Sequence, residues 1–136
     1  IAAGLDRRFG WTRPPGFGVS LAMLAPVLAG WALADWAMAS NRFFAATVRI
    51  QADRGHAVVS SGPYRIVRHP GYAGAILACA ALPLMLGSVW GFVPFGVSLA
   101  AVVARTSLED RTLRAELPGY EGYCRVTRWR LVPGIW

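Results

Sequence analysis

The feature that most restricts the fold of this chain is an apolar segment at residues 17–39, FGVSLAMLAPVLAGWALADWAMA. Roughly 20 apolar residues in a helix are long enough to cross the ~30 Å hydrocarbon core of a bilayer. Two further apolar segments, at residues 72–86 and 88–105, meet at Gly87-Ser88 and predict a helical hairpin. Both ends of a hairpin emerge on the same side of a membrane. The sequence therefore predicts an all-α, multi-pass transmembrane helical bundle.

The composition supports this interpretation and restricts the partners. Of the 136 residues, 55% are hydrophobic and 15% are charged, whereas a soluble domain carries about 25% charged residues. All 14 basic residues are arginine, and most lie in the connector at residues 41–71 or from Arg105 onward. By the positive-inside rule these segments face the cytoplasm. Arginines so placed suit anionic membrane lipids rather than nucleic acid, and the arginine-only, alanine-rich composition is typical of a bacterial inner-membrane protein.

A short polar element, residues 61–74 with the sequence SGPYRIVRHPGYAG, precedes the second apolar segment. Pro63 and Pro70 fix φ and keep the residues before them out of the helical region. A helix is expected to begin just after Pro70, with its N–H groups and positive dipole end beside three basic side chains. This arrangement predicts an anion site. The alternative is an arginine-rich loop that anchors the helix among lipid headgroups. The three basic residues are Arg65, Arg68 and His69.

The tail at residues 106–136 predicts a cytoplasmic amphipathic helix, which Pro118-Gly119 would end. Glu109 and Asp110 return an acidic pair to the face that carries the basic element. Tyr123 adds an aromatic side chain on the turn that follows. The alternative is an interfacial helix with ordinary surface charges.

Other features of the chain carry weaker predictions. Residues 1–16 predict a loop or interfacial piece, and because the chain begins with Ile1 we expect further spans to precede it. Asp35 is an acidic residue within a span, which makes it a functional candidate. Cys79 and Cys124 show neither a disulfide framework nor the spacing of metal ligands, so no disulfide and no metal site is expected.

Basic, acidic and aromatic side chains thus converge at one mouth of the predicted bundle. Such a set suits a zwitterionic, nucleotide-like molecule, because carboxylates accept hydrogen bonds from ribose hydroxyls and arginine binds a carboxylate. Aromatic rings can cover an adenine or a cation. The sequence contains neither Gly-x-Gly-x-x-Gly nor a P-loop, which excludes the ordinary soluble dinucleotide folds.

The stretch GPYRIVRHPGYAG, followed after the hairpin by LEDRTLRAELPGYEGYCRV, resembles the isoprenylcysteine carboxyl methyltransferase and phospholipid methyltransferase group of membrane enzymes. The resemblance runs from Asn41 onward and implies a single membrane methyltransferase domain over residues 1–136. It implies that S-adenosyl-L-methionine binds at the cytosolic helix ends. Asp110 departs from the family, which has a second Glu there, and residues 117–119 replace a Phe-Gly pair. The cofactor positions implied are His56, Tyr64, Arg68, His69, Pro70, Tyr72, Gly74, Glu109, Asp110 and Tyr123.

The resemblance also implies roles in the reaction. Methyl transfer from a sulfonium is an in-line displacement, so the enzyme supplies mainly alignment and electrostatics. A carboxylate acceptor needs a nearby cation, for which Arg105, Arg68 and His69 are the candidates. An amine acceptor would instead need a base, and His56 or His69 could serve at neutral pH.

The acceptor is expected to be a lipophilic small molecule or a lipidated substrate that enters from the bilayer. The small residues Gly74, Ala75 and Ala78 predict one wall of a gap between spans through which it passes. No obligate protein partner is expected. Two alternatives stay open: an NADPH-dependent membrane sterol or enone reductase, and a non-enzymatic helical-hairpin membrane protein.

Overall fold

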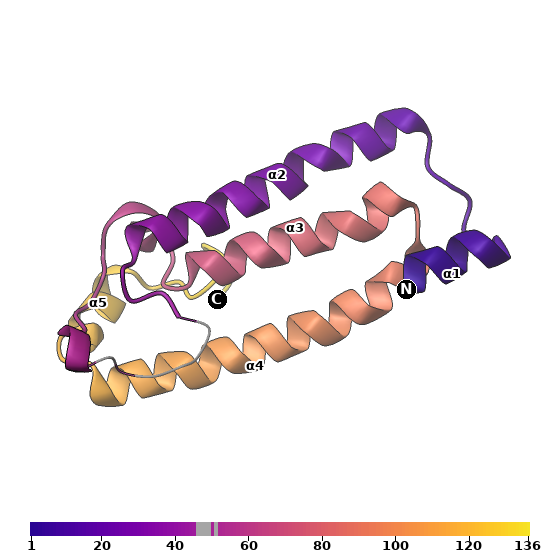
Figure 1. The fold of residues 1–136 in the computed structure, drawn as a ribbon. Coiled ribbons are helices and arrows are strands. Elements are labelled where there is room, and N and C mark those ends of the chain that lie inside the picture. The colour runs from indigo at the N-terminus through magenta and orange to yellow at the C-terminus, as the bar shows by residue number, and fades with distance from the viewer. Residues whose placement is uncertain (46–49, 51) are drawn as a thin grey trace.

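The computed structural model describes residues 1–45, 50 and 52–136. Within these residues the chain is all-α, with five α-helices, three short 3₁₀-helices and no strand. The helices α2, α3 and α4 run side by side in alternating directions, as Figure 1 shows. The α-helices are α1 (Ala2–Phe9), α2 (Phe17–Ser40), α3 (Pro70–Leu86), α4 (Phe92–Glu116) and α5 (Tyr120–Val126). The 3₁₀-helices are η1 (Ala52–Arg54), η2 (Gly62–Arg65) and η3 (Val89–Gly91).

Helices α2 and α3 pack against each other through their backbones. A Cβ at Gly30 would lie 2.5 Å from the carbonyl oxygen of Gly74 and 2.6 Å from the amide nitrogen of Ala78. Ala78 itself is fully buried, at 0% exposure. Small residues permit this close approach of two helices. The prediction that Gly74, Ala75 and Ala78 wall a gap for the acceptor is therefore wrong for Gly74 and Ala78, because α2 packs directly against both.

The predicted helical hairpin is confirmed. Helix α3 ends at Leu86, and Gly87 adopts the left-handed conformation, with φ 64°, that a glycine accepts without strain. The Ser88 side chain then accepts a hydrogen bond from the amide of Gly91 at 3.1 Å, which caps η3. The chain turns through η3 directly into α4.

Helix α4 is longer than the sequence indicated. The sequence indicated a span at residues 88–105 and an amphipathic helix in the tail at residues 106–136, and the structure joins the two in α4, which runs without interruption from Phe92 to Glu116. The change from apolar to charged residues at Arg105 marks a change of surroundings and not of backbone, since residues 105–116 contain neither Pro nor Gly. The helix ends where predicted, and Gly119 has a φ of 84° that starts the turn into α5.

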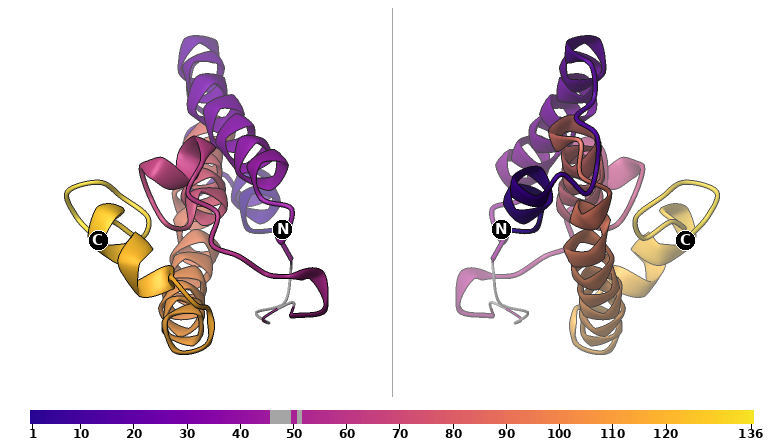
Figure 2. Two further views of the ribbon diagram at one scale, coloured as in Figure 1. Left: turned by 90° about the vertical axis from the view of Figure 1, so that its left-hand side faces the viewer. Right: turned by 90° about the vertical axis from the view of Figure 1, so that its right-hand side faces the viewer.

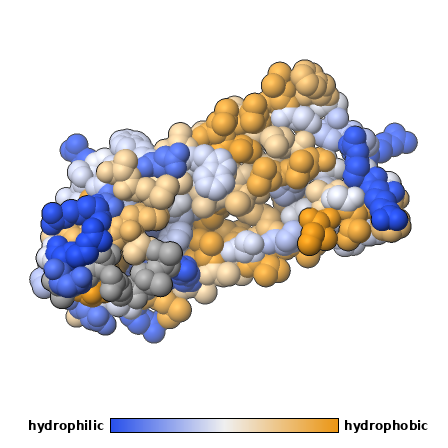
Figure 3. Space-filling model, viewed as in Figure 1, coloured by the Kyte–Doolittle hydropathy of each residue, from blue (hydrophilic) through white to orange (hydrophobic). Residues whose placement is uncertain are grey.

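In the part of the chain that the structure describes, two helices are long and apolar enough to cross a membrane, namely residues 17–40 and the combined η3–α4 segment at residues 89–116. Few of their apolar side chains are buried within the protein, which distinguishes them from the core helices of a soluble protein. Figure 3 shows apolar residues along the middle of the molecule and hydrophilic residues gathered at its two ends. This distribution matches a helical hairpin and a third helix surrounded by lipid.

The end of the bundle that carries the hairpin turn is fixed by a buried carboxylate. Residues 1–16 were expected to be a loop or interfacial piece, and α1 makes part of this segment helical. Asp6 on α1 is 1% exposed. Its carboxylate accepts hydrogen bonds from the amide and hydroxyl of Thr12, at 2.8 and 2.9 Å, and from the hydroxyl of Ser88. Trp11 adds an edge-on ring contact to Trp90, with centroids 5.8 Å apart.

Candidate functional site

A cavity of about 330 Å³ lies at the opposite end of the bundle from the hairpin turn. Its walls come from the connector after α2, the first turn of α3, the last turns of α4 and from α5. Figure 2 shows α5 and the C-terminal residues on one side of α4, and the part of the connector that carries η1 on the other side. The cavity is therefore built from segments that are far apart in the sequence.

Most of the predicted site residues line this cavity. Three predicted cofactor residues do not: Pro70, Gly74 and Asp110 are absent from its walls. Pro70 occupies the first turn of α3, Gly74 contacts α2, and Asp110 is buried behind the cavity. The predicted residues on the walls are His56, Tyr64, Arg68, His69, Tyr72, Arg105, Glu109 and Tyr123.

Asp110 lies at the centre of a buried ionic cluster. It is 0% exposed, and its carboxylate lies 2.9 Å from Nε of Arg68. Nε of Arg114 and Nε of Arg130 donate hydrogen bonds to Oδ2 at 3.2 and 3.1 Å. The hydroxyl of Tyr120 donates to Oδ1 at 3.1 Å. A buried carboxylate held by three guanidinium groups fixes the arginine that reaches the cavity, Arg68, in one orientation.

His69 also points toward this cluster. Its Nε2 lies 3.6 Å from Oδ1 of Asp110, which is beyond hydrogen-bond distance. The His69 ring stacks against Tyr72, with centroids 6.0 Å apart. His69 therefore presents one ring face to Tyr72 and one ring edge to the carboxylate.

A second polar chain faces the cavity itself. Nε of Arg105 donates a hydrogen bond to the Tyr72 hydroxyl at 2.7 Å, and that hydroxyl donates to Oε2 of Glu109 at 2.9 Å. Arg105 and Glu109 are one helical turn apart on α4, so they lie on the same face. Arg105 is exposed and Glu109 is half-buried. The chain thus runs from the outer rim of the cavity to its interior.

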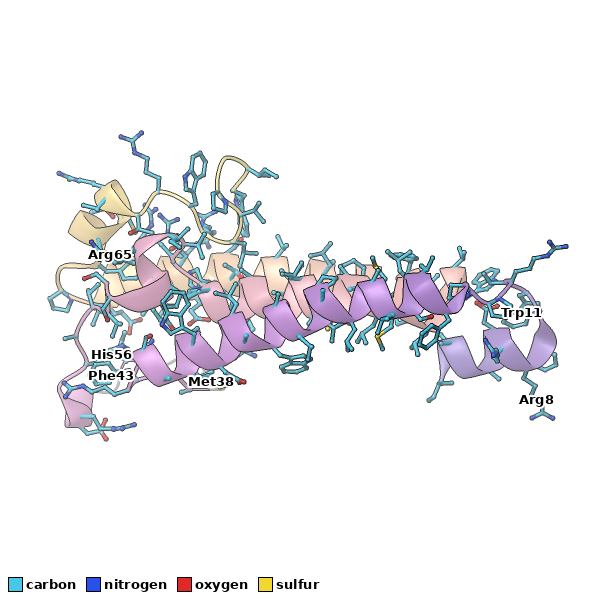
Figure 4. The ribbon with its side chains drawn as sticks, turned by 90° about the horizontal axis from the view of Figure 1, so that it is seen from above. Arg8, Trp11, Met38, Phe43, His56 and Arg65 are labelled. Atoms are coloured by element: carbon cyan, nitrogen blue, oxygen red, sulfur yellow. The ribbon has the colours of Figure 1, made fainter. Side chains whose placement is uncertain are left out.

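Aromatic side chains form the wall on the connector side. Figure 4 shows Phe43 and His56 next to each other at this end of the molecule, and their ring centroids lie 4.5 Å apart. Burial lowers the pKa of His56 below its ordinary value. Burial thus favours the neutral form of the His56 imidazole. Phe43 was not predicted, although an Arg-Phe-Phe triplet directly after a span was the available signal.

The tyrosines on the cavity walls hold the connector against α5. The Tyr123 hydroxyl donates to the carbonyl of Tyr64 at 2.7 Å, and the Asn41 amide donates to the hydroxyl of Tyr64 at 3.2 Å. Burial raises the pKa of Tyr64 and of Tyr123 above the ordinary value. Both phenols therefore stay protonated at physiological pH and act as hydrogen-bond donors or acceptors, not as charges.

The backbone of the C-terminal segment, residues 127–136, holds the Arg68-His69 dipeptide. The Arg68 amide donates to the carbonyl of Trp129 and the His69 amide to the carbonyl of Arg130, each at 2.9 Å. Nη1 of Arg68 donates to the carbonyls of Thr127 and Arg128, each at 3.2 Å. Four consecutive carbonyls thus accept hydrogen bonds from two residues. The sequence reasoning missed this segment, because backbone acceptors leave no pattern of residue types.

Two comparisons with known proteins bear on this arrangement. The model of the isoprenylcysteine carboxyl methyltransferase (ICMT) family matches residues 21–115, which is more than half of the chain. Protein-S-isoprenylcysteine O-methyltransferase B of Arabidopsis thaliana is 27% identical over 81 residues. That match covers 60% of this chain and 39% of the relative, so the chain spans less than half of the length of that protein.

Proposed function

The chain belongs to the isoprenylcysteine carboxyl methyltransferase family, and from that premise we propose that it is a membrane enzyme that methylates a lipophilic carboxylate with S-adenosylmethionine. Members of this family are S-adenosylmethionine-dependent methyltransferases. The observation that carries the proposal is the cavity in which Arg68, Tyr72 and Glu109 meet beside the adjacent rings of Phe43 and His56.

The donor and acceptor groups of the cavity fit this cofactor. S-Adenosylmethionine carries a carboxylate, a ribose, an adenine and a cationic sulfur. Arg68 offers a guanidinium to a carboxylate, and Glu109 offers a carboxylate to ribose hydroxyls or to a cation. The rings of Phe43, His56 and Tyr72 offer faces to an adenine or a sulfonium. The cavity of about 330 Å³ lies in the size range of ligand pockets, roughly 300–1,000 Å³.

The bound cofactor supplies an electrophilic methyl group, and the residues of this chain supply position and charge. A carboxylate acceptor is already a nucleophile, so it needs orientation rather than deprotonation. Arg105 at the exposed rim can hold such a carboxylate, with its own orientation fixed by the Tyr72 hydroxyl at 2.7 Å. Arg68 and His69 remain the other proposed catalytic candidates, deeper in the site. The apolar wall made by Leu113 and Leu117 suits a lipophilic acceptor.

The domain arrangement and the membrane orientation are part of the same proposal. Residues 1–136 form one membrane methyltransferase domain, with the connector at residues 41–71 and the tail at residues 106–136 on the cytoplasmic side. The arginine distribution of the sequence supports this orientation. The candidate spans and the family membership support an integral membrane location.

Calorimetric titration of the detergent-purified chain with S-adenosylhomocysteine tests the cofactor half of the proposal. We expect saturable binding that Glu109→Gln weakens at least ten-fold, since a hydrogen bond to a charged group contributes about 1.5–3 kcal/mol. The matched control is Glu116→Gln, because Glu116 is exposed at the end of the same helix. Binding of NADPH in place of S-adenosylhomocysteine would support a reductase, and unaltered properties of Glu109→Gln would support a non-enzymatic protein.

Methylation of an S-prenylated cysteine tests the acceptor half. We expect the free carboxylate to be methylated and the matching carboxamide to be inert. Arg105→Gln should lower turnover and raise KM for the acceptor while S-adenosylhomocysteine still binds. Methylation of a lipophilic amine, but of no carboxylate, would instead point to His56 as a base.

A further inference from the structure

We propose that Arg130 is a positioning residue that holds the C-terminal segment, residues 127–136, on the Arg68-His69 dipeptide and so keeps the cofactor cavity in its binding conformation. The inference rests on the proposed function, since it assigns a role in the same site. Arg130 is not among the site residues that the sequence predicted, and it lies outside residues 21–115, which the family model matches.

The first argument is the number of hydrogen bonds that connect the segment with the dipeptide. Two backbone amides and one guanidinium nitrogen of Arg68 and His69 donate to the four carbonyls of residues 127–130. Arg68 and His69 are each 6% exposed. Buried donors such as these need a partner, and losing one is costly. Without the segment, Arg68 would keep Asp110 but lose its backbone partners.

The second argument is that Arg130 closes a loop of contacts. Its carbonyl accepts from the His69 amide at 2.9 Å, and its side chain donates to Asp110 at 3.1 Å. Asp110 in turn contacts Arg68 at 2.9 Å. Arg130 therefore touches both the backbone that carries the site arginine and the carboxylate that orients it.

The third argument is that the segment itself is organised around Arg130. The Arg130 guanidinium lies over the Trp136 ring at 4.8 Å from the centroid, a cation–π contact. The amides of Arg130 and Leu131 both donate to the carbonyl of Trp136, at 2.8 and 3.0 Å. Leu131 is 5% exposed and anchors the turn. The segment is thus a closed turn from which the Arg130 side chain reaches Asp110.

Arg130 does not line the cavity, so it acts through Arg68 and His69 and is not a catalytic residue. Removing its charge should free the segment locally and leave α2, α3 and α4 packed as before. The Arg68 and His69 amides would then exchange with solvent, and Arg68 would bind the ligand from a less ordered position.

The experiment combines hydrogen exchange with ligand titration on the purified full chain. Exchange of the peptide that contains residues 66–69 is measured by mass spectrometry for wild type, Arg130→Gln, Arg130→Lys and Arg125→Gln. Arg125 is an exposed arginine on α5 and serves as the charge-matched control. The S-adenosylhomocysteine affinity and the melting temperature of each variant are measured in parallel.

We expect Arg130→Gln to increase exchange at residues 66–69, but not in α2, and to lower affinity about ten-fold, as the loss of a charge-assisted hydrogen bond implies. Arg130→Lys should recover most of both, and Arg125→Gln should change neither. Unchanged exchange, or faster exchange with unchanged affinity, would overturn the inference. If the wild type does not bind S-adenosylhomocysteine, the proposed function fails, while exchange still decides whether Arg130 holds the segment.

Discussion

The two adjacent acids, Glu109 and Asp110, have different surroundings, so neutralising each should have a different effect. The Asp110 side chain is 1% exposed and lies against the Arg68 side chain, which is 4% exposed. Asp110→Asn leaves that arginine buried beside a neutral amide. Breaking one partner of a buried ion pair costs about 3–5 kcal/mol. Glu109 is half-buried and accepts one hydrogen bond, from Tyr72, which a glutamine can still accept.

The expected magnitudes separate the two substitutions clearly. For a chain of this size, each kcal/mol shifts the melting temperature by roughly 3–4 °C, so Asp110→Asn should lower it by about 10 °C or more. Glu109→Gln should change it by about 2 °C or less, as is usual for residues outside a buried network. The assay is thermal unfolding in detergent, followed by tryptophan fluorescence, with S-adenosylhomocysteine titration at low temperature.

In the titration, Glu109→Gln should bind S-adenosylhomocysteine at least ten-fold more weakly although its melting temperature is preserved. Glu116→Gln, on the exposed end of α4, should match wild type in both measurements. Similar melting temperatures for Glu109→Gln and Asp110→Asn would refute the reasoning, because they would show that the buried cluster around Asp110 contributes no more than a surface charge.

Three further predictions concern other parts of the molecule. Gly30→Ala should force α2 and α3 apart and lower stability by about 1–3 kcal/mol. Gly96→Ala on α4, where a Cβ meets open space, should be neutral or stabilising by up to about 1 kcal/mol. The melting temperatures of both variants and of the wild type check the two expectations. Because burial lowers the pKa of His56, this residue should gain a proton only at a pH below the ordinary histidine range, and the added charge should weaken binding of the cationic S-adenosylmethionine relative to S-adenosylhomocysteine. Calorimetry of both ligands against pH measures the ratio of the two affinities. A ratio that stays equally pH-dependent in His56→Gln would contradict the prediction. Burial of Asp6 opposes ionisation, but its hydrogen bonds from Ser88 and Thr12 outweigh this and hold the pKa of Asp6 below 3.8. The contribution of Asp6 to stability is therefore complete above that pH and is lost as the pH falls through the lower folded-state pKa. Acid titration followed by tryptophan fluorescence should show α1 leaving the hairpin turn, and Asp6→Asn should remove this transition.

The helices were predictable because their causes are local. Short stretches of sequence contain all of these causes: the length of an apolar run, the proline at the first turn of α3 and the glycine at its end. The continuation of α4 beyond Arg105 was missed because a change in polarity resembled a helix boundary. Polarity reports what surrounds a helix, and only residues such as Pro118-Gly119 report where its backbone ends.

The sequence predicted the residue types of the candidate site, but not which of these residues line the cavity and which are buried behind it. Neighbouring residues on a helix point about 100° apart, so one of Glu109 and Asp110 had to face inward, but the sequence does not say which. Gly74 and Ala78 indicated that something approaches α3 closely, and only the packing shows that it is α2. The hold of residues 127–130 on Arg68 depends on backbone carbonyls, which every residue possesses.

The length of α3 has a consequence for the membrane around the protein. Its 17 residues extend about 25 Å at 1.5 Å per residue, which is less than the ~30 Å thickness of a typical hydrocarbon core. Gly30 and Gly74 fix α3 to the longer α2, so α3 cannot shift along it to hide this difference. We therefore expect the bilayer to thin beside α3, which would bring the headgroups of the leaflet toward Arg68 and His69. If the chain has the proposed methyltransferase activity, that activity should therefore depend on the chain length of the surrounding lipids.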